Sequence, residues 1–113
     1  MDYERAQGRE PSDVSAQDLG YDIRSLAPTP AGGGVPRYIE VKARAQSGPI
    51  IMTPNEWLMA QRLRQDYWLY VVENASTQPH LYTIPDPAAT LTAEERVEVV
   101  RYIIKDWKRG TSP

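Results

Sequence analysis

The chain reads Gly20-Tyr21-Asp22-Ile23-Arg24-Ser25 in one segment and, after a turn-rich gap, Arg37-Tyr38-Ile39-Glu40-Val41-Lys42 in the next. Successive side chains of a β-strand point to opposite faces of its sheet. In the second segment, Glu40 and Lys42 therefore share one face at a separation of about 6.5 to 7 Å. Ile39, Val41 and Ala43 share the other face. This alternation predicts a strand with one apolar face and one face of ionisable groups.

The first segment supplies a second carboxylate. If the two segments pair as neighbouring strands, Asp22 lies beside Glu40. Both carboxylates and the ammonium of Lys42 would then meet at one spot on the sheet, where carboxylate oxygens could hold a hard divalent cation. An acid and a base two residues apart on a strand are also common on an ordinary solvated face. The pattern alone leaves both interpretations open.

Composition limits the classes of fold and site. With 113 residues and 41% hydrophobic content, the chain suits one compact domain with a single small core. It has no cysteine and one histidine, His80. A disulfide framework, a zinc finger, a thiol nucleophile and a cluster of imidazole ligands are therefore excluded. Any metal must bind through oxygen.

Charge and hydropathy limit the partners. The formal net charge of -2 argues against a strongly basic protein, although nucleic-acid binders can confine their positive charge to one face. No apolar run approaches the roughly 18 residues of a membrane-spanning helix. The charged start, Met1-Asp2-Tyr3-Glu4-Arg5, is no signal peptide,. We therefore expect a soluble, intracellular and cytoplasmic protein, nucleoid-associated if bacterial, without membrane contact.

Turn residues and apolar spacing divide the first half of the chain into short elements. We expect the last turns of a helix over 1–7, a short edge strand over 13–16, a strand over 21–26, a flexible hairpin loop over 28–36 and a strand over 37–43,. The first helix should end at Gly8. Because only a stub of that helix is present, we expect the chain to be a piece of a longer polypeptide.

A second helix begins at a strong capping sequence, Thr53-Pro54-Asn55-Glu56. Threonine is the N-cap, proline takes the first helical position, and the glutamate can reach back to the cap amide. The helix should run to about Arg64, with a buried stripe of Trp57, Ala60 and Leu63. The apolar and aromatic run 67–72 then predicts a central strand covered on both faces.

The remaining segments predict one more strand and one more helix. The strand covers 81–84 and ends at Pro85-Asp86-Pro87, and Thr92-Ala93-Glu94-Glu95 opens a helix to about Arg109,. The inner face of this helix should consist of Val97, Val100, Ile104 and Trp107. The order helix, three strands, helix, two strands, helix predicts an α/β sandwich, with a mixed central sheet flanked by helices.

Several of these segments together are similar to one known family. They are Glu4, Gly8-Arg9, Asp13-Val14-Ser15, Gly20-Tyr21-Asp22-Ile23, Tyr38-Ile39-Glu40-Val41-Lys42, Thr53-Pro54-Asn55-Glu56-Trp57 and Tyr67-Trp68-Leu69-Tyr70-Val71-Val72. Over roughly residues 3–87 the chain resembles the NO VEIN C-terminal domain family. Its members often end large helicase or ATPase chains and look like the restriction-endonuclease superfamily with its PD-(D/E)xK signature. The resemblance implies a restriction-endonuclease-like sandwich, a single nuclease-like domain over 1–113 that belongs to a larger helicase- or ATPase-type protein.

The resemblance also implies roles for particular residues. Asp22 would be the strand aspartate of the signature, Glu40 its second acid and Lys42 its lysine, and these three are the implied catalytic residues. Asp22, Glu40 and the backbone carbonyl of Val41 would bind Mg²⁺ or Mn²⁺, and Glu4 would match a carboxylate that many members place on the first helix. Glu4 is equally open to being merely exposed.

The sequence departs from the strict signature in two places. Tyr21 precedes Asp22 where the name of the signature expects proline, and no acid follows the Glu40-Lys42 pair nearby, so a site with one metal ion is favoured. Glu56 is explained by its capping box. Candidate contacts to nucleic acid are Gln46, Asn55, Arg62, Arg101 and Lys105.

Two functional interpretations follow. The first is a metal-dependent phosphodiester hydrolase, a DNA endonuclease-like domain that accompanies a helicase or ATPase. The alternative is a non-catalytic module of the same fold that binds nucleic acid or another protein. The expected partners are nucleic acid, DNA in the first place, and the helicase or ATPase domains of the parent chain. A homodimer stays open, because restriction-type nucleases that cut both strands often act as dimers.

Overall fold

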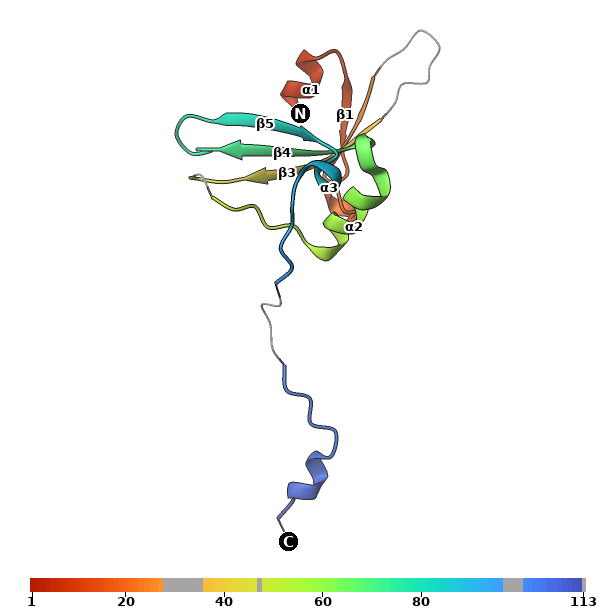
Figure 1. The fold of residues 1–113 in the computed structure, drawn as a ribbon, viewed down its shortest axis with the longest axis vertical. Helices are drawn as coiled ribbons and strands as arrows, with labels where there is room; N and C mark the ends of the chain where they lie inside the picture. Colours follow the sequence, from red (N-terminus) through yellow and green to blue (C-terminus); the bar gives the residue numbers. More distant parts are fainter. Residues whose placement is uncertain (28–35, 47, 97–100, 113) are drawn as a thin grey trace.

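The computed structural model describes residues 1–27, 36–46, 48–96 and 101–112. Five strands form one sheet in the order β1-β2-β3-β4-β5 (Figure 1). They are β1 Glu10–Asp13, β2 Ile23–Leu26, β3 Arg37–Ala43, β4 Tyr67–Glu73 and β5 His80–Pro85. Only β3 and β4 run parallel, and the other neighbouring pairs are antiparallel. The sheet is therefore mixed, as the sequence predicts.

The helices are short and lie on both faces of the sheet (Figure 1). They are α1 Asp2–Ala6, α2 Pro54–Leu63 and α3 Pro87–Thr90, with 3-10 turns η1 Ser15–Gln17, η2 Arg64–Asp66 and η3 Trp107–Gly110. The connection from β3 to β4 carries α2, as a crossover between parallel strands requires. None of the helices in the described residues is long and apolar enough to cross a membrane.

The register of β3 and β4 fixes which side chains share a face. Glu40 pairs with Leu69 and Lys42 with Val71, while Ile39 pairs with Trp68. Since paired residues point the same way, Glu40 and Lys42 lie on the face that α2 covers. The buried hydrophobic residues among those described come mainly from these strands and are Ile39, Ala60, Tyr67, Leu69, Tyr70 and Val71.

The start of α2 forms as predicted. The Thr53 hydroxyl accepts a hydrogen bond from the Glu56 N–H at 3.2 Å, and Glu56 Oε1 accepts one from the Thr53 N–H at 2.8 Å. These reciprocal bonds satisfy two amides that a helix start leaves without partners. Ala60 on the predicted inner stripe is completely buried. The sequence prediction of this helix is confirmed.

Of two elements predicted near the N-terminus, the structure agrees with the helix and differs from the strand. The helix stub is confirmed as α1, followed by Gly8 at φ +77°. The edge strand predicted over 13–16 is wrong in position, because β1 covers Glu10–Asp13. Asp13 Oδ1 accepts hydrogen bonds from the backbone N–H and the hydroxyl of Ser15 at 2.9 and 2.6 Å. This side-chain turn ends the strand at Asp13.

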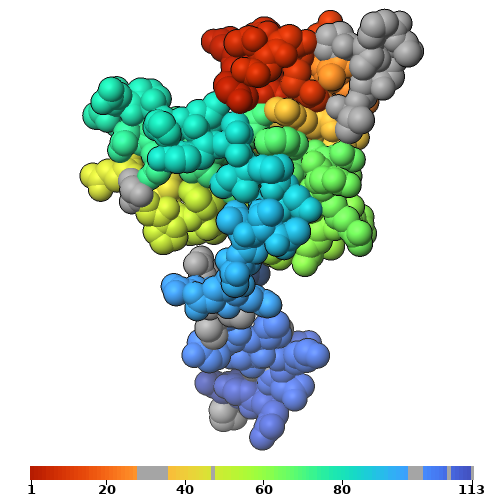
Figure 2. Space-filling view, turned by 45° about the horizontal axis from the view of Figure 1, so that its top comes forward, coloured from red at the N-terminus to blue at the C-terminus, as the bar shows by residue number. Residues whose placement is uncertain are grey.

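The prediction of a helix over 92–109 is wrong for the residues that the structure describes. The described residues of this segment before 97 and over 101–106 are not helical, and 97–100, with Val97 and Val100, lie outside the described residues. Ile104, expected on the inner face, is 71% exposed. In both views residues 101–112 extend away from the sheet (Figures 1 and 2). A helix of this length needs an apolar surface to pack against, and the described part of the segment has none.

The sequence also missed a helical turn after the last strand. The segment Pro85-Asp86-Pro87 was expected only to end β5, whereas Pro87 begins α3 and is itself buried. The flexible loop predicted over 28–36 lies outside the described residues, apart from Pro36.

Candidate functional site

Asp22 lies directly before β2 and binds β3 through both its backbone and its side chain. Its N–H donates to the carbonyl of Ile39 at 2.8 Å, and its Oδ2 accepts from the N–H of Val41 at 3.0 Å. Ile23 pairs with Ile39 in the β2–β3 ladder, so Asp22 adjoins Glu40. The structure thus brings together the two carboxylates that the sequence selected.

Lys42 joins these carboxylates from the same face of β3. Its Nζ lies 3.5 Å from Glu40 Oε1 and 2.8 Å from Glu56 Oε1. Glu40 is 3% exposed, whereas the side chains of Lys42 and Glu56 are 22% and 15% exposed. We call Asp22, Glu40, Lys42 and Glu56 the Glu40 cluster.

Glu56 is the member that sequence reasoning missed. The capping box alone explains this residue in the sequence, yet the oxygen that caps α2 also accepts the bond from Lys42. The two residues lie on different elements and are 14 positions apart. No local pattern in the sequence signals such a contact, because it depends on how the helix sits over the sheet.

The cluster shifts the proton affinities of its members. Burial raises the pKa of Glu40 to about 8, with help from the hydrogen bond to Glu56 and the charge of Asp22. Burial acts to raise the pKa of Glu56 too, but hydrogen bonds from Lys42 and the Thr53 amide hold that pKa below its usual value. At neutral pH Glu40 therefore carries the proton and Glu56 carries the charge.

Lys42 is held in its charged form. Burial acts to lower the pKa of its ammonium, but the hydrogen bond to Glu56 and the nearby carboxylates outweigh burial and raise it. Burial, with the charges of the Glu40 cluster, also raises the pKa of the adjacent Tyr67 phenol. Titratable groups perturbed together at one place are typical of functional sites.

The oxygen atoms of the Glu40 cluster suit a hard cation. Among the described residues, no three His, Cys, Asp or Glu side chains stand as a ready metal group. Mg²⁺ often takes only one or two protein carboxylates and keeps several waters. Asp22 and Glu40 offer that number. The N–H of Val41 faces Asp22, and the carbonyl of the same strand residue points to the same side of β3. This donor set fits Mg²⁺ or Mn²⁺.

Glu4 does not belong to this cluster. Its Oε2 accepts a 2.6 Å hydrogen bond from the Tyr70 hydroxyl, and its Oε1 lies 3.4 Å from Arg9 Nε and 3.7 Å from Arg37 Nη1. Tyr70 and Arg37 face the side of the sheet away from Glu40, because strand residues alternate. Glu4 is 1% exposed and lies buried on that opposite side. Glu4 is therefore not merely exposed, and its place on the opposite side of the sheet is against the expectation that it joins Asp22 and Glu40 as a metal ligand.

Comparison with known proteins places the chain in a family. Residues 1–84 match the family described as Protein NO VEIN, C-terminal. The chain belongs to this family. The matched range contains the whole Glu40 cluster as well as Glu4. Comparisons with curated proteins and with solved structures found no significant match.

The expected nucleic-acid contacts are scattered over this NO VEIN C-terminal domain. Asn55 is exposed in the first turn of α2 beside Glu56, and Gln46 and Arg62 are exposed on the loop after β3 and at the end of α2. Arg101 and Lys105 are exposed in the segment that leads away from the sheet and lie beyond the matched range. Of the five, only Asn55 adjoins a member of the Glu40 cluster in the chain.

Proposed function

We propose that this NO VEIN C-terminal domain is a metal-dependent phosphodiester hydrolase of the PD-(D/E)xK type, acting on DNA. The observation that carries the proposal is the meeting of Asp22, Glu40 and Lys42 across neighbouring strands. Helices on both faces of a mixed sheet support a restriction-endonuclease-like sandwich (Figure 1). The family resemblance supports helicase or ATPase domains of a longer chain as partners.

Each residue of the cluster has a distinct task in this proposal. Asp22, Glu40 and the Val41 carbonyl would hold Mg²⁺ or Mn²⁺. The bound ion supplies Lewis-acid chemistry, which acidifies water and neutralises charge on the phosphate. Glu40 must release its proton before it can bind a cation. Lys42 would orient the attacking water or stabilise the charge that develops on the phosphate oxygens.

Glu56 would position Lys42 in the proposed site. Its carboxylate fixes Lys42 Nζ at 2.8 Å and keeps the amine protonated. A protonated lysine can donate hydrogen bonds to phosphate oxygens, and a fixed one loses little entropy when it does so. The capping bond to Thr53 ties this contact to the start of α2.

The test is cleavage of supercoiled plasmid and of labelled single-stranded DNA with Mg²⁺ or Mn²⁺. We expect the native chain to cut and both Glu40→Ala and Lys42→Ala to lose at least about 100-fold in rate, the effect of removing a group that stabilises the transition state. Glu10→Ala, which removes an exposed acid of β1, is the matched control and should cut like the native chain. Equal rates in all the variants would contradict the proposed site.

A non-catalytic nucleic-acid-binding or protein-interaction module is the second candidate. The observation that favours it is the short Lys42–Glu56 ion pair, which neutralises the amine that a nuclease would aim at its substrate. DNA binding without cleavage, unchanged by both alanine substitutions, would support this candidate and place the contacts elsewhere.

A further inference from the structure

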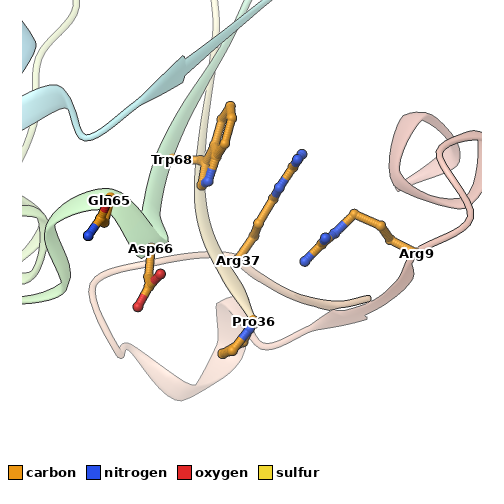
Figure 3. Close-up of a pocket in the computed structure, with 6 residues that line it drawn as sticks. All are labelled: Arg9, Pro36, Arg37, Gln65, Asp66 and Trp68. Atoms are coloured by element: carbon orange, nitrogen blue, oxygen red, sulfur yellow. The ribbon is translucent and has the colours of Figure 1, made fainter. Parts of the chain in front are cut away.

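A cavity of about 200 Å³ opens on the face of the sheet opposite the Glu40 cluster (Figure 3). Its walls come from the turn after α1, the start of β3, η2 and β4. The lining residues are Arg9, Pro36, Arg37, Gln65, Asp66 and Trp68. The proposed hydrolase mechanism uses none of them.

Arg37 is held rigidly at this cavity. Its guanidinium lies 4.2 Å from the centre of the Trp68 ring, and Nη1 donates to the Tyr70 hydroxyl at 3.0 Å. Stacking and one hydrogen bond fix the plane of the group. A guanidinium carries five N–H donors, and within the described part of the chain Arg37 makes this one hydrogen bond. The side chain is 27% exposed, so further donors can reach a ligand.

Arg9 brings a second guanidinium to the same place. It donates to the hydroxyl and the carbonyl of Ser25 at 3.1 and 2.8 Å. Both arginines also approach the same carboxylate, Glu4, whose Oε1 lies 3.4 and 3.7 Å from them and accepts no hydrogen bond among the described residues. Two cations thus share one anion.

The local charge favours an anionic ligand. The guanidinium groups of Arg9 and Arg37 both approach the carboxylate of Glu4, and an anion between or above them would relieve the repulsion between the two cations. Asp66 also lines the cavity, but its carboxylate points away from both guanidinium groups (Figure 3). Among the described residues that line the cavity, no other acid competes for the guanidinium of Arg37.

We propose that this cavity binds a phosphate group, carried either by a nucleic-acid strand or by a free nucleotide. The planar forks of arginine match phosphate oxygens in pairs. At about 200 Å³ the cavity is smaller than the roughly 300 Å³ or more of pockets for drug-sized ligands. It suits a phosphate with little more than its ester oxygen and adjoining sugar.

The experiment is an NMR titration of the full chain with three probes: inorganic phosphate, a 5′-mononucleotide and a short single-stranded DNA. In the native chain we expect the Trp68 indole N–H and the backbone amides of Arg9 and Arg37 to shift with all three probes. A strand that binds at least about tenfold tighter than the mononucleotide would identify nucleic acid as the source of the phosphate. Equal affinities would identify a free nucleotide.

Three variants give the site its control. Arg37→Lys keeps the charge but loses the fork, and should weaken the binding of each probe about tenfold. Arg24→Lys, the same change at an exposed arginine of β2, should alter it less than about twofold. Glu40→Gln should leave these shifts unchanged. The proposal is overturned if no probe shifts the Trp68 and Arg37 signals, or if both arginine variants weaken binding equally. Neither outcome bears on cleavage at the opposite face.

Discussion

Glu56 shows how one side chain can serve the fold and the candidate site together. One oxygen atom caps α2 and also binds Lys42 Nζ, both at 2.8 Å. Because Glu56 and Glu40 share a hydrogen bond, the proton of Glu40 links the two carboxylates. The charge state of Glu40 therefore bears on stability as well as on metal binding.

At the residue scale, stability should fall as pH rises through the Glu40 titration. The pKa of Glu40 is about 8 in the folded chain and 4.5 for the unperturbed group. The folded state holds this proton more tightly, so its contribution is fully present below about pH 4.5 and is lost as pH rises through about 8. Glu40→Gln stays neutral at every pH and can keep the hydrogen bond to Glu56.

Urea unfolding with a chelator present tests this prediction. Relative to the native chain, Glu40→Gln should gain at least about 1 kcal/mol between about pH 5 and about pH 9, close to the free energy of one pKa unit. Glu10→Gln, an exposed acid on β1, should show no such gain. Parallel pH profiles for the native chain and Glu40→Gln would contradict the raised pKa.

At the element scale, the contact between α2 and the segment before β2 depends on Gly20. Its φ is +86°, and a Cβ there would lie 3.1 Å from the Asn55 carbonyl oxygen and from Met59. Gly8 has a similar φ of +77°, but no atom of the described residues outside its chain neighbours lies within 4 Å of such a Cβ. A side chain at either glycine would strain the backbone, but only at Gly20 would it also clash with described atoms. Comparing the two positions therefore separates the free-energy cost of strain from that of the clash.

Alanine substitutions measure the two costs. Gly8→Ala should destabilise the chain by about 1–2 kcal/mol, because the left-handed conformation disfavours a Cβ. Gly20→Ala should cost about 1–3 kcal/mol more, since a backbone oxygen cannot move aside cheaply. The free energies of unfolding in urea give both values. Equal losses would mean that α2 does not pack closely on Gly20.

The sequence predicted elements well where the determining interactions are local. The strand over 37–43 and the capping box at Thr53 follow from alternation and from contacts within four residues. The face on which Glu4 lies was not predictable, because it depends on the pairing of strands far apart in the chain. The contact between Glu56 and Lys42 was missed for the same reason. The apolar spacing over 92–109 predicted a helix with an inner face. Spacing alone does not reveal whether another element packs against that face, and in the described residues Ile104 is exposed.

At the scale of the whole molecule, the buried hydrophobic residues among those described lie in the sheet and in α2. Residues 101–112 lead away from this body (Figure 2), and Tyr102 and Ile103 are 90% and 81% exposed. A chain that ends at Val100 should therefore lose less than about 0.5 kcal/mol of unfolding free energy. Urea unfolding of the two lengths checks this. A loss above about 2 kcal/mol would show that the removed residues pack on the sheet in solution.

The candidate site and the cavity lie on opposite faces of the same strands. Lys42 and Glu40 project from β3 toward α2, whereas Arg37 projects toward Glu4 and α1. The two proposals therefore predict separable losses, because a substitution on one face leaves the charges on the other in place. The central claim concerns the α2 face, where Asp22 and Glu40 would hold a divalent cation.

The most direct measurement is the line broadening that Mn²⁺ causes in the NMR spectrum of the full chain. We predict broadening at substoichiometric Mn²⁺ that is strongest at the amides of Asp22 and Val41 and much weaker at the amides of Glu4 and Arg9, which lie on the other side of the sheet. Asp22→Asn should abolish it, whereas Glu10→Gln should leave it unchanged. Broadening that ignores the Asp22 substitution, or that is centred on Glu4, would contradict a metal site at the Glu40 cluster.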